Sequence, residues 1–231
     1  MISVQAAKAY DGKVPIDEHF KANEKTSSEP NPFIRNAYTR CVRVAAITNE
    51  GTITSSGVIF ETGLVVTSAH LDQNAKRLYR VLINDHEAEA LPCHMKFTTH
   101  FDLQAWRVKT RRLSPIRFEL SRVKGRPVFY VGNPEFFNRE LLKGEVTGFN
   151  KYEIRASTLT GLGMSGCAMY DALTGGLLGI VTKEQGSNLN FTTALRSIHV
   201  EKFYREVQEY LRKYPGRSPV SPPPPVQLDL L

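Results

Sequence analysis

The sequence predicts an all-β fold in which two six-stranded antiparallel β-barrels stand side by side and a helix follows them. The first observation is a series of short β-type runs that begins near residue 38, each bounded by turn residues. The second is a break in this series at 113–122, after which similar runs resume. The third is a switch to helical periodicity at residue 197. Short, regularly spaced strands are typical of antiparallel barrels and sandwiches, and two series joined by one connector favour two small barrels.

These breaks divide the 231-residue chain into six segments. They are an N-terminal extension (1–37), a first barrel (38–112), a connector (113–122), a second barrel (123–196), a helix (197–214) and a Pro-rich tail (215–231). The extension is polar and contains the loop-like stretch "KTSSEPNPF", so we expect it to be only partly ordered. No internal sequence repeat relates the two barrels.

Each barrel is expected to contain six strands. Those of the first barrel are "RCVRVAAIT", "TSSGVIFE", "GLVVTSA", "YRVLIN", "EAEALPC" and "LQAWRVK". Those of the second barrel are "PVFYVGNP", "LLKGEVTGFN", "YEIRAST", "CAMYDA", "GGLLGIVTKE" and "LNFTTAL".

Residues 197–214 carry the apolar stripe of an amphipathic helix, formed by Val200, Phe203, Val207, Tyr210 and Leu211. Ser197 is positioned to cap the N-terminus of this helix, and we expect the helix to pack on the second barrel. The tail "PGRSPVSPPPPVQLDLL" is expected to be an extended polyproline-like linker, or a ligand for a partner domain.

Charge and composition limit the classes of partner and compartment. The formal net charge is +7, and basic residues cluster at 107–112 and 122–126. This surface is a candidate for RNA contact, although a charge run is more often a solvated face. No apolar run is long enough to span a bilayer, and the N-terminus has no apolar signal region. The sparse cysteines (Cys41, Cys93 and Cys167) fit a reducing compartment, so we expect a cytoplasmic location, in the host cytoplasm for a viral protein.

Ser165, in the glycine-rich stretch "GLGMSGCAMYD" at 161–171, is a candidate nucleophile. Because a serine hydroxyl is a weak nucleophile, it needs a base, a group that orients the base, and donors for the oxyanion. His70 ends the hairpin "GVIFETGLVVTSAH", where a small-residue turn can present an imidazole at a barrel rim. Asp102 enters the alternating strand "DLQAWRV", where it is either a strand-capping residue or the group that orients the imidazole.

The glycines before Ser165 supply the third requirement. Gly161 and Gly163 permit positive φ, so the amides of Gly163 and Ser165 can point into one cavity as an oxyanion hole.

An α/β-hydrolase site is excluded by motif and by order. Its G-x-S-x-G elbow is missing, because Cys167 follows Gly166. Its acid and histidine would have to follow the serine, where the folded core offers Asp171 and His199, and the strand pattern is all-β rather than βαβ.

In this order, "VVTSAH", "DLQAWRV" and "GMSGCAMYD…GGLLGIVT" resemble the motifs of trypsin/chymotrypsin-like serine peptidases. "GRPVFYVGNPEF…LLKGEVTGF" is similar to a strand pair of bacterial high-temperature-requirement-type proteases in that superfamily. "TGLGMSG" resembles the T-x-x-G-x-S-G pattern of polyprotein-processing serine proteases from positive-strand RNA viruses, such as the sobemovirus type. The resemblance covers about residues 40 to 200.

The resemblance implies a chymotrypsin-like double barrel with its active site in the cleft between the barrels. His70 is then the general base, Asp102 its orienting acid and Ser165 the nucleophile, with the amides of Gly163 and Ser165 as the oxyanion hole. Secreted members have an Asp before the serine that pairs with a new N-terminus; Met164 stands there, so the site should be competent without an activating cut.

The resemblance also implies a specificity pocket with Leu159 and Thr160 on one side. The other wall is the stretch "IVTKEQ", with candidate substrate-binding residues Val181, Thr182, Lys183 and Glu184. Thr182 to Glu184 are expected to pair with an extended substrate as an added strand. The histidine that viral relatives cutting after Gln or Glu carry near Val181 is absent, as is the acid near Leu159 that basic specificity requires. A medium-sized apolar or small polar residue before the cut is therefore favoured.

The leading hypothesis is a serine endopeptidase that processes a viral polyprotein, with its own polyprotein as a candidate substrate, and that needs no cofactor. The alternatives are an intracellular quality-control-type serine protease without a PDZ domain, and a protease-like RNA-binding module. No metal is expected, because the spacing of His86, Cys93, His94 and His100 matches no standard zinc pattern.

Overall fold

A computed structural model describes eleven stretches of the chain: residues 29–48, 51–60, 64–70, 78–83, 86–87, 89–95, 102–107, 113–134, 139–158, 160–184 and 191–213. The Pro-rich tail and residues 1–28 of the extension lie outside these ranges.

The N-terminal sheet has seven strands, which are β1 (Cys41–Thr48), β2 (Gly51–Ile59), β3 (Leu64–Thr67), β4 (Leu78–Ile83), β5 (His86–Glu87), β6 (Glu89–Met95) and β7 (Leu103–Arg107). Their order across the sheet is β5-β4-β1-β2-β3-β7-β6. The edge strand β5 ends at Glu87, and the other edge strand, β6, begins at Glu89. The Cα atoms of these two residues are therefore at most about 7 Å apart. The two edge strands are consecutive in the chain, and β5 with β6 takes the place of the one predicted strand "EAEALPC".

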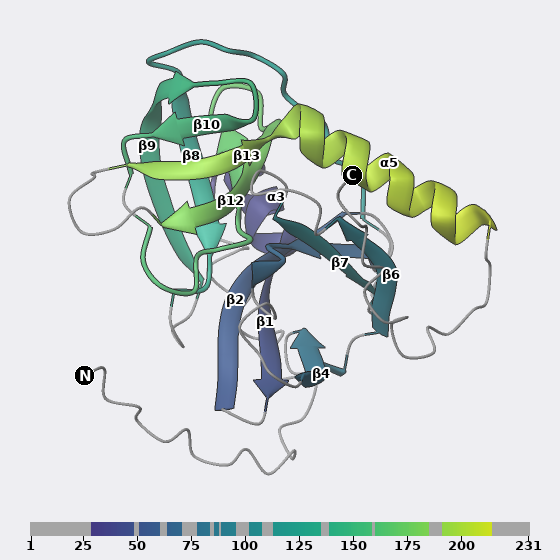
Figure 1. Ribbon diagram of the computed structural model, residues 1–231. Helices are drawn as coiled ribbons and strands as arrows, with labels where there is room; N and C mark the ends of the chain where they lie inside the picture. Colours follow the sequence, from purple (N-terminus) through teal and green to yellow (C-terminus); the bar gives the residue numbers. More distant parts are fainter. Residues whose placement is uncertain are drawn as a thin grey trace, which may run out of the picture.

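The C-terminal sheet is a closed six-stranded barrel (Figure 1). Its strands are β8 (Pro127–Gly132), β9 (Glu140–Phe149), β10 (Glu153–Ala156), β11 (Ala168–Asp171), β12 (Leu177–Glu184) and β13 (Thr192–Arg196). The ring order is β10-β13-β12-β11-β8-β9. All six lie where the sequence predicts them, and the all-β, chymotrypsin-like double barrel is confirmed.

Strand alternation explains how the chain fills two barrels and the layer between them. In β8, Val128 and Tyr130 point into the second barrel, while Phe129 and Val131 belong to a different core cluster. That cluster also includes Val58 of β2 and residues of β3 and β7, so it is the interface between the barrels. Both faces of β8 are buried, which is why this strand is apolar almost throughout.

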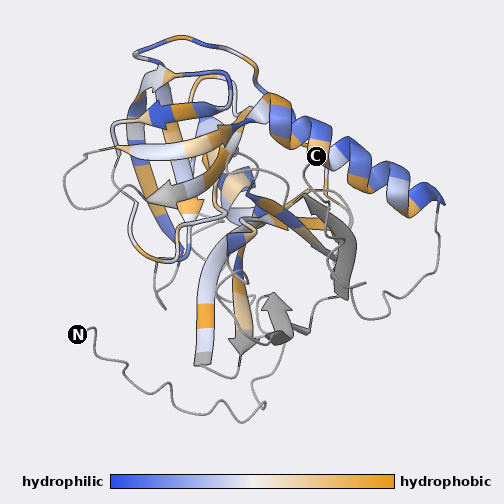
Figure 2. Ribbon diagram, in the orientation of Figure 1, coloured by the Kyte–Doolittle hydropathy of each residue, from blue (hydrophilic) through white to orange (hydrophobic). Residues whose placement is uncertain are grey.

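The C-terminal helix α5 (Ser197–Lys213) lies across both barrels, contacting β12 and β13 of one and β6 and β7 of the other (Figure 1). The expectation that it packs on the second barrel is confirmed, but it covers only part of the contact. Phe203 and Tyr204 also reach the interface cluster, where the ring of Tyr204 lies tilted against those of Phe60 and Phe118. Figure 2 shows apolar residues alternating with hydrophilic ones along α5. Among the described residues, no helix is long and apolar enough to cross a membrane.

Ser197 does not act as the predicted N-cap. It is the first residue of α5, and its hydroxyl donates to the carbonyl of Glu119 at 2.6 Å. This bond fixes the start of α5 to the connector between the barrels.

A helix that the sequence reading missed, α3 (Pro32–Arg40), occupies the end of the predicted extension. Asn31 caps it, accepting from the amides of Phe33 and Ile34, and Pro32 takes its first position. The Pro and Asn residues that suggested a loop are therefore helix-start signals. Arg40 at its end is buried and donates to the carbonyls of Ile59 (3.1 Å) and Ser114 (2.6 Å).

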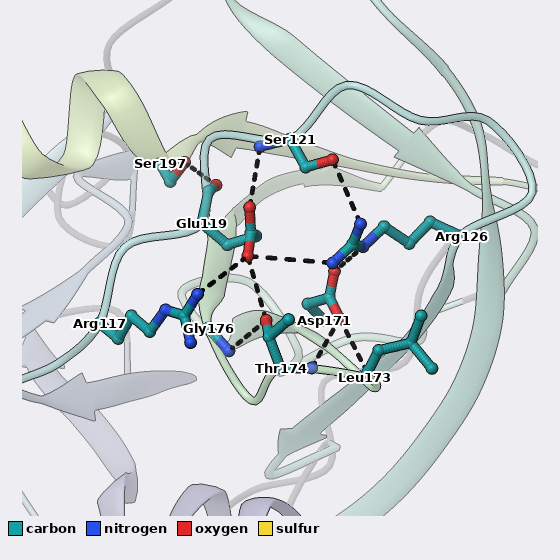
Figure 3. Close-up of polar contacts among 9 residues, drawn as sticks. All are labelled: Arg117, Glu119, Ser121, Arg126, Asp171, Leu173, Thr174, Gly176 and Ser197. Atoms are coloured by element: carbon teal, nitrogen blue, oxygen red, sulfur yellow. Dashed lines mark hydrogen bonds and ion pairs between the residues drawn. The ribbon is translucent and has the colours of Figure 1, made fainter.

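A polar network ties the connector to the turn after β11 (Figure 3). Asp171 is fully buried at the end of β11 and pairs with Arg126. Its second oxygen accepts from the amides of Leu173 (2.8 Å) and Thr174 (2.9 Å). Glu119 accepts from the Thr174 hydroxyl at 3.1 Å, so the carboxylates hold one turn from two sides.

We expect Asp171→Ala to lower the free energy of unfolding by about 3 kcal/mol, because it leaves Arg126 and two amides without their acceptor. The measurement is urea-induced unfolding followed by circular dichroism. The control is Arg117→Ala, since Arg117 is largely exposed and lies 4.0 Å from Glu119, so its loss should cost less than about 1 kcal/mol. Equal effects of the two substitutions would contradict the structural role of Asp171.

Candidate active site

His70 and Asp102 lie together because β3 and β7 pair antiparallel. Thr67 at the end of β3 is opposite Gln104 at the start of β7, so the residues just beyond the two strands meet. The His70 amide donates to Asp102 Oδ1 at 2.6 Å, and His70 Nδ1 contacts Asp102 Oδ2. The amide of Ala69 donates to the Asp102 carbonyl at 3.2 Å.

These contacts set the tautomer of the imidazole. An ionised carboxylate only accepts hydrogen bonds, so Nδ1 of His70 carries a proton toward Asp102. In the neutral ring Nε2 is then the acceptor. The His70 side chain is 39% exposed and that of Asp102 is 16% exposed, so the ring is accessible while the carboxylate is shielded.

The loop that carries Ser165 is fixed to the first barrel through β2. We call residues 161–167 the Ser165 loop. The carbonyl of Ser165 accepts from the amide of Ser56 at 2.9 Å and from the hydroxyl of Ser55 at 2.5 Å. The carbonyl of Ser56 in turn accepts from the hydroxyl of Thr67, three residues before His70, at 2.6 Å. The segments of Ser165 and His70 are thus both bonded to the backbone of the same β2 residue, Ser56.

Four amides of the Ser165 loop have no protein acceptor among the described residues, those of Gly161, Leu162, Gly163 and Ser165, and the last two are the predicted oxyanion donors. Gly163 has φ of +87°, as expected for a glycine that turns its amide. Within the described residues, no hydrogen bond joins the Ser165 hydroxyl to the imidazole. Catalytic hydrogen bonds are often formed only when substrate is bound.

Gly166 permits the close approach of the two barrels. Its φ is +83°, and a Cβ there would lie 2.1 Å from the carbonyl oxygen of Ser56 and 2.3 Å from the hydroxyl of Thr67. Any side chain at this position would therefore push the Ser165 loop away from the His70 segment.

Met164 anchors the Ser165 loop in the second barrel. Its side chain is fully buried in the barrel core, and a Cβ on Gly132 would lie 2.5 Å from its sulfur. Cys167 is also fully buried in this core, as the reading of it as a small apolar residue predicts.

The residues of the predicted specificity pocket are described in part. Thr160 is half-buried, and its hydroxyl lies 3.1 Å from that of Thr192 in β13. Val181 is buried in the barrel core, and Thr182 is buried at a register shift between Val181 and Lys183. Leu159 and the side chains of Lys183 and Glu184 lie outside the described residues.

Sequence reasoning missed Ser55, Ser56 and Asn133. The Asn133 amide donates to the Ser56 hydroxyl at 2.8 Å, and its side chain donates to the Val42 carbonyl at 2.9 Å. The signal available in the sequence was the hydroxyl pair in "TSSG", which directly precedes the apolar run "GVIF".

The residues of the discarded alternatives lie elsewhere. His199 contacts the carbonyl of Lys151 at 3.0 Å, and Asp171 pairs with Arg126, so neither forms a hydrolase site. Arg126 is therefore a structural residue rather than part of a free basic surface. The side chains proposed for the discarded zinc site (His86, Cys93, His94 and His100), together with Arg111 and Arg112, lie outside the described residues.

The comparison with protein families decides the class. Residues 55–180, from β2 through the Ser165 loop into β12, match the trypsin-like peptidase domain. The chain belongs to the trypsin-like peptidase family. This peptidase is a serine endopeptidase, a hydrolase with a chymotrypsin-like fold.

Solved structures share the fold of this peptidase at low sequence identity. The serine endoprotease from Yersinia pestis superposes with a TM-score of 0.63 at 21% identity, over 79% of this chain and 68% of that one. The active form of the Rv3671c protease from M. tuberculosis gives 0.64 at 16% identity, over 83% and 89%. The HtrA-type protease AlgW, solved with a tripeptide, gives 0.60 at 20% identity, over 76% and 63%. No curated protein matches the chain.

Proposed function

We propose that this peptidase cleaves peptide bonds with Ser165 as nucleophile, His70 as general base and Asp102 as the group that orients His70. The observation that carries the proposal is the double contact between His70 and Asp102, bonded through β2 to the loop of Ser165. Asp102 accepts from both the backbone and the ring of His70, which fixes the ring and its tautomer together.

The reaction follows from these groups. Nε2 of His70 accepts the proton of the Ser165 hydroxyl while its oxygen bonds to the substrate carbonyl carbon. The carbonyl oxygen becomes an oxyanion, which the amides of Gly163 and Ser165 bind. His70 then gives the proton to the leaving amine, the C–N bond breaks, and an acyl-enzyme remains on Ser165. Water attacks that ester with the same base and releases the acid.

A fluorophosphonate probe tests the assignment of the nucleophile. We expect the folded peptidase to be phosphonylated at one site, with mass spectrometry of a digest locating the adduct on Ser165. Prior heat denaturation should prevent labelling, because the base and the oxyanion donors are then lost. An adduct on another residue, or none, would contradict the proposal.

We further propose that the physiological cut is at a defined junction in a viral polyprotein. Support comes from the "TGLGMSG" motif and from the buried Met164, which leaves the loop without the Asp that an activating cut would engage. Cleavage of one junction in a polyprotein while casein stays intact is the expected result. General degradation of unfolded casein would instead favour a quality-control protease, the class that the HtrA-type fold neighbour suggests.

We propose that Thr160 presents a hydrogen-bond acceptor to the substrate side chain before the cut. The Thr192 hydroxyl lies 2.5 Å from the carbonyl of Thr158 and must donate to it, because a carbonyl only accepts. With the proton of Thr192 used there, the hydroxyl of Thr160 must donate to Thr192. The Thr160 hydroxyl can then only accept a hydrogen bond from the substrate side chain. It therefore favours a side chain that donates, such as an amide or a hydroxyl, over a carboxylate.

We expect peptides with Gln before the cut to be cleaved faster than matched peptides with Glu. Thr160→Val should lower kcat/KM for the Gln peptide roughly fivefold, the effect of one hydrogen bond. A Met peptide serves as control and should be cleaved by both proteins at similar rates. If the variant affects Gln and Met peptides alike, Thr160 does not select the side chain.

A further inference from the structure

We propose that Ser55 and Ser56 are positioning residues that hold the Ser165 loop with the amides of Gly163 and Ser165 toward the substrate. The inference rests on the proposed function, since it concerns the oxyanion donors of that site. Both serines are buried in β2, and both hydroxyls reach across to the other barrel.

The Ser56 hydroxyl accepts one hydrogen bond and donates another, and the chemistry of its partners fixes which is which. It accepts from the amide of Asn133 at 2.8 Å, and it lies 2.7 Å from the carbonyl of Gly163. Because a carbonyl only accepts, the single proton of Ser56 is donated to Gly163. The oxygen of Gly163 is thus fixed on the side of the first barrel.

Bonds at both ends lock the peptide planes of the Ser165 loop. In the plane after Gly163, the carbonyl is bonded to Ser56, and the amide of Met164 donates to Gly161 at 3.1 Å. In the plane after Met164, the carbonyl accepts from Cys167 at 3.0 Å, which leaves the opposed amide of Ser165 without a protein acceptor.

The plane after Ser165 is held most firmly. Its carbonyl accepts from the amide of Ser56 and the hydroxyl of Ser55, and its other end, the amide of Gly166, donates to Val181 at 2.7 Å. A trans peptide places its amide and carbonyl on opposite sides. Pulling the carbonyls toward β2 therefore sets the directions in which the neighbouring amides can point.

The two serines should contribute unequally. Ser56→Ala removes the only bond that the described residues make to the carbonyl of Gly163, the glycine whose amide must face the oxyanion. Ser55→Ala leaves the Ser165 carbonyl its bond from the Ser56 amide. The first substitution should disturb the loop more.

The test is steady-state peptide cleavage by Ser56→Ala and Ser55→Ala, with Ser68→Ala as matched control. Ser68 is also a buried serine of the first barrel, but its hydroxyl has no hydrogen-bond partner among the residues that the structure describes. We expect Ser56→Ala to lower kcat roughly 10- to 100-fold with KM little changed, since the oxyanion forms after binding. Ser55→Ala should lower kcat less than tenfold, and Ser68→Ala should stay within about twofold.

A second readout separates positioning from stability. A peptidyl boronate forms a tetrahedral adduct on the serine, so its inhibition constant should rise in parallel with the loss of kcat. The binding of the matching peptide product, which has no oxyanion, should not change. Melting temperatures identify any variant that is unfolded at the assay temperature.

The outcomes distinguish a positioning role of Ser56 from a purely structural one. A kcat for Ser56→Ala equal to that of Ser68→Ala, or equal losses of boronate and product binding, would overturn the proposal. If Ser56→Ala does not fold, Ser55→Ala decides by the same criteria. Cleavage retained by Ser165→Ala would overturn the proposed function and this inference with it, whereas a positioning failure alone leaves the Ser165 assignment standing.

Discussion

Replacing Ser165 with alanine is expected to lower kcat by about 10⁶-fold while the fold is retained, the size seen when the nucleophile of a serine protease is removed. The loss is large because no other hydroxyl can form the acyl-enzyme at that position. The fold should survive because the Ser165 hydroxyl makes no hydrogen bond among the described residues, and the bonds that hold the loop all involve its backbone. We expect the free energy of unfolding to change by less than about 0.5 kcal/mol.

The measurement is cleavage of a fluorogenic peptide, together with thermal unfolding. Ser157→Ala is the matched control, because Ser157 is exposed and its hydroxyl makes one hydrogen bond among the described residues, accepting from the amide of Glu145 at 3.0 Å. Its kcat should equal that of the parent protein. Hydrolysis that persists in a purified Ser165→Ala sample would remove Ser165 from the mechanism.

Replacing Asp102 with asparagine is expected to lower kcat about 10⁴-fold. The asparagine has nearly the same shape, but it can turn its NH₂ group toward Nδ1 of His70. The ring then accepts at Nδ1 and carries its proton on Nε2, so it can no longer take the proton of Ser165. Substrate binding should be little affected, because Asp102 lies behind the ring and is shielded.

The control for Asp102→Asn is Glu145→Gln, which makes the same chemical change at an exposed strand position. Nuclear magnetic resonance of the imidazole nitrogens provides an independent readout and should show the proton moved from Nδ1 to Nε2. A loss in kcat below tenfold, or an unchanged tautomer, would mean that Asp102 does not orient His70.

The strands of this peptidase could be read from the sequence because strand patterns are local. In β8, both faces are buried, and the apolar run 127–132 is visible without any knowledge of its partners. The helix α5 is equally predictable from the sequence, since its apolar stripe repeats within the helix itself. The sequence did not predict α3, because its proline and asparagine are equally typical of a loop and of a helix start. Only the packing of this segment against β8 decides in favour of the helix.

Some residues of the candidate site could likewise be predicted from the sequence, and others could not. His70, Asp102 and Ser165 could be proposed from the sequence because each lies in a short motif and the motifs occur in a recognisable order. The roles of Ser55 and Ser56 could not, because hydroxyls in a strand carry no sign of what they bond to. Their partners are 110 and 107 residues further along the chain.

The sequence by itself determined which segments form most strands and the C-terminal helix, and which three side chains are the candidates for the chemistry of a serine peptidase. These properties depend on residue type and on periodicity over a few neighbours. Only the tertiary structure decided that α5 spans both barrels, that Arg126 belongs to a buried network with Asp171, and that β2 holds the Ser165 loop. Each of these depends on hydrogen bonds and packing between distant segments, which exist only when the two barrels have closed against each other.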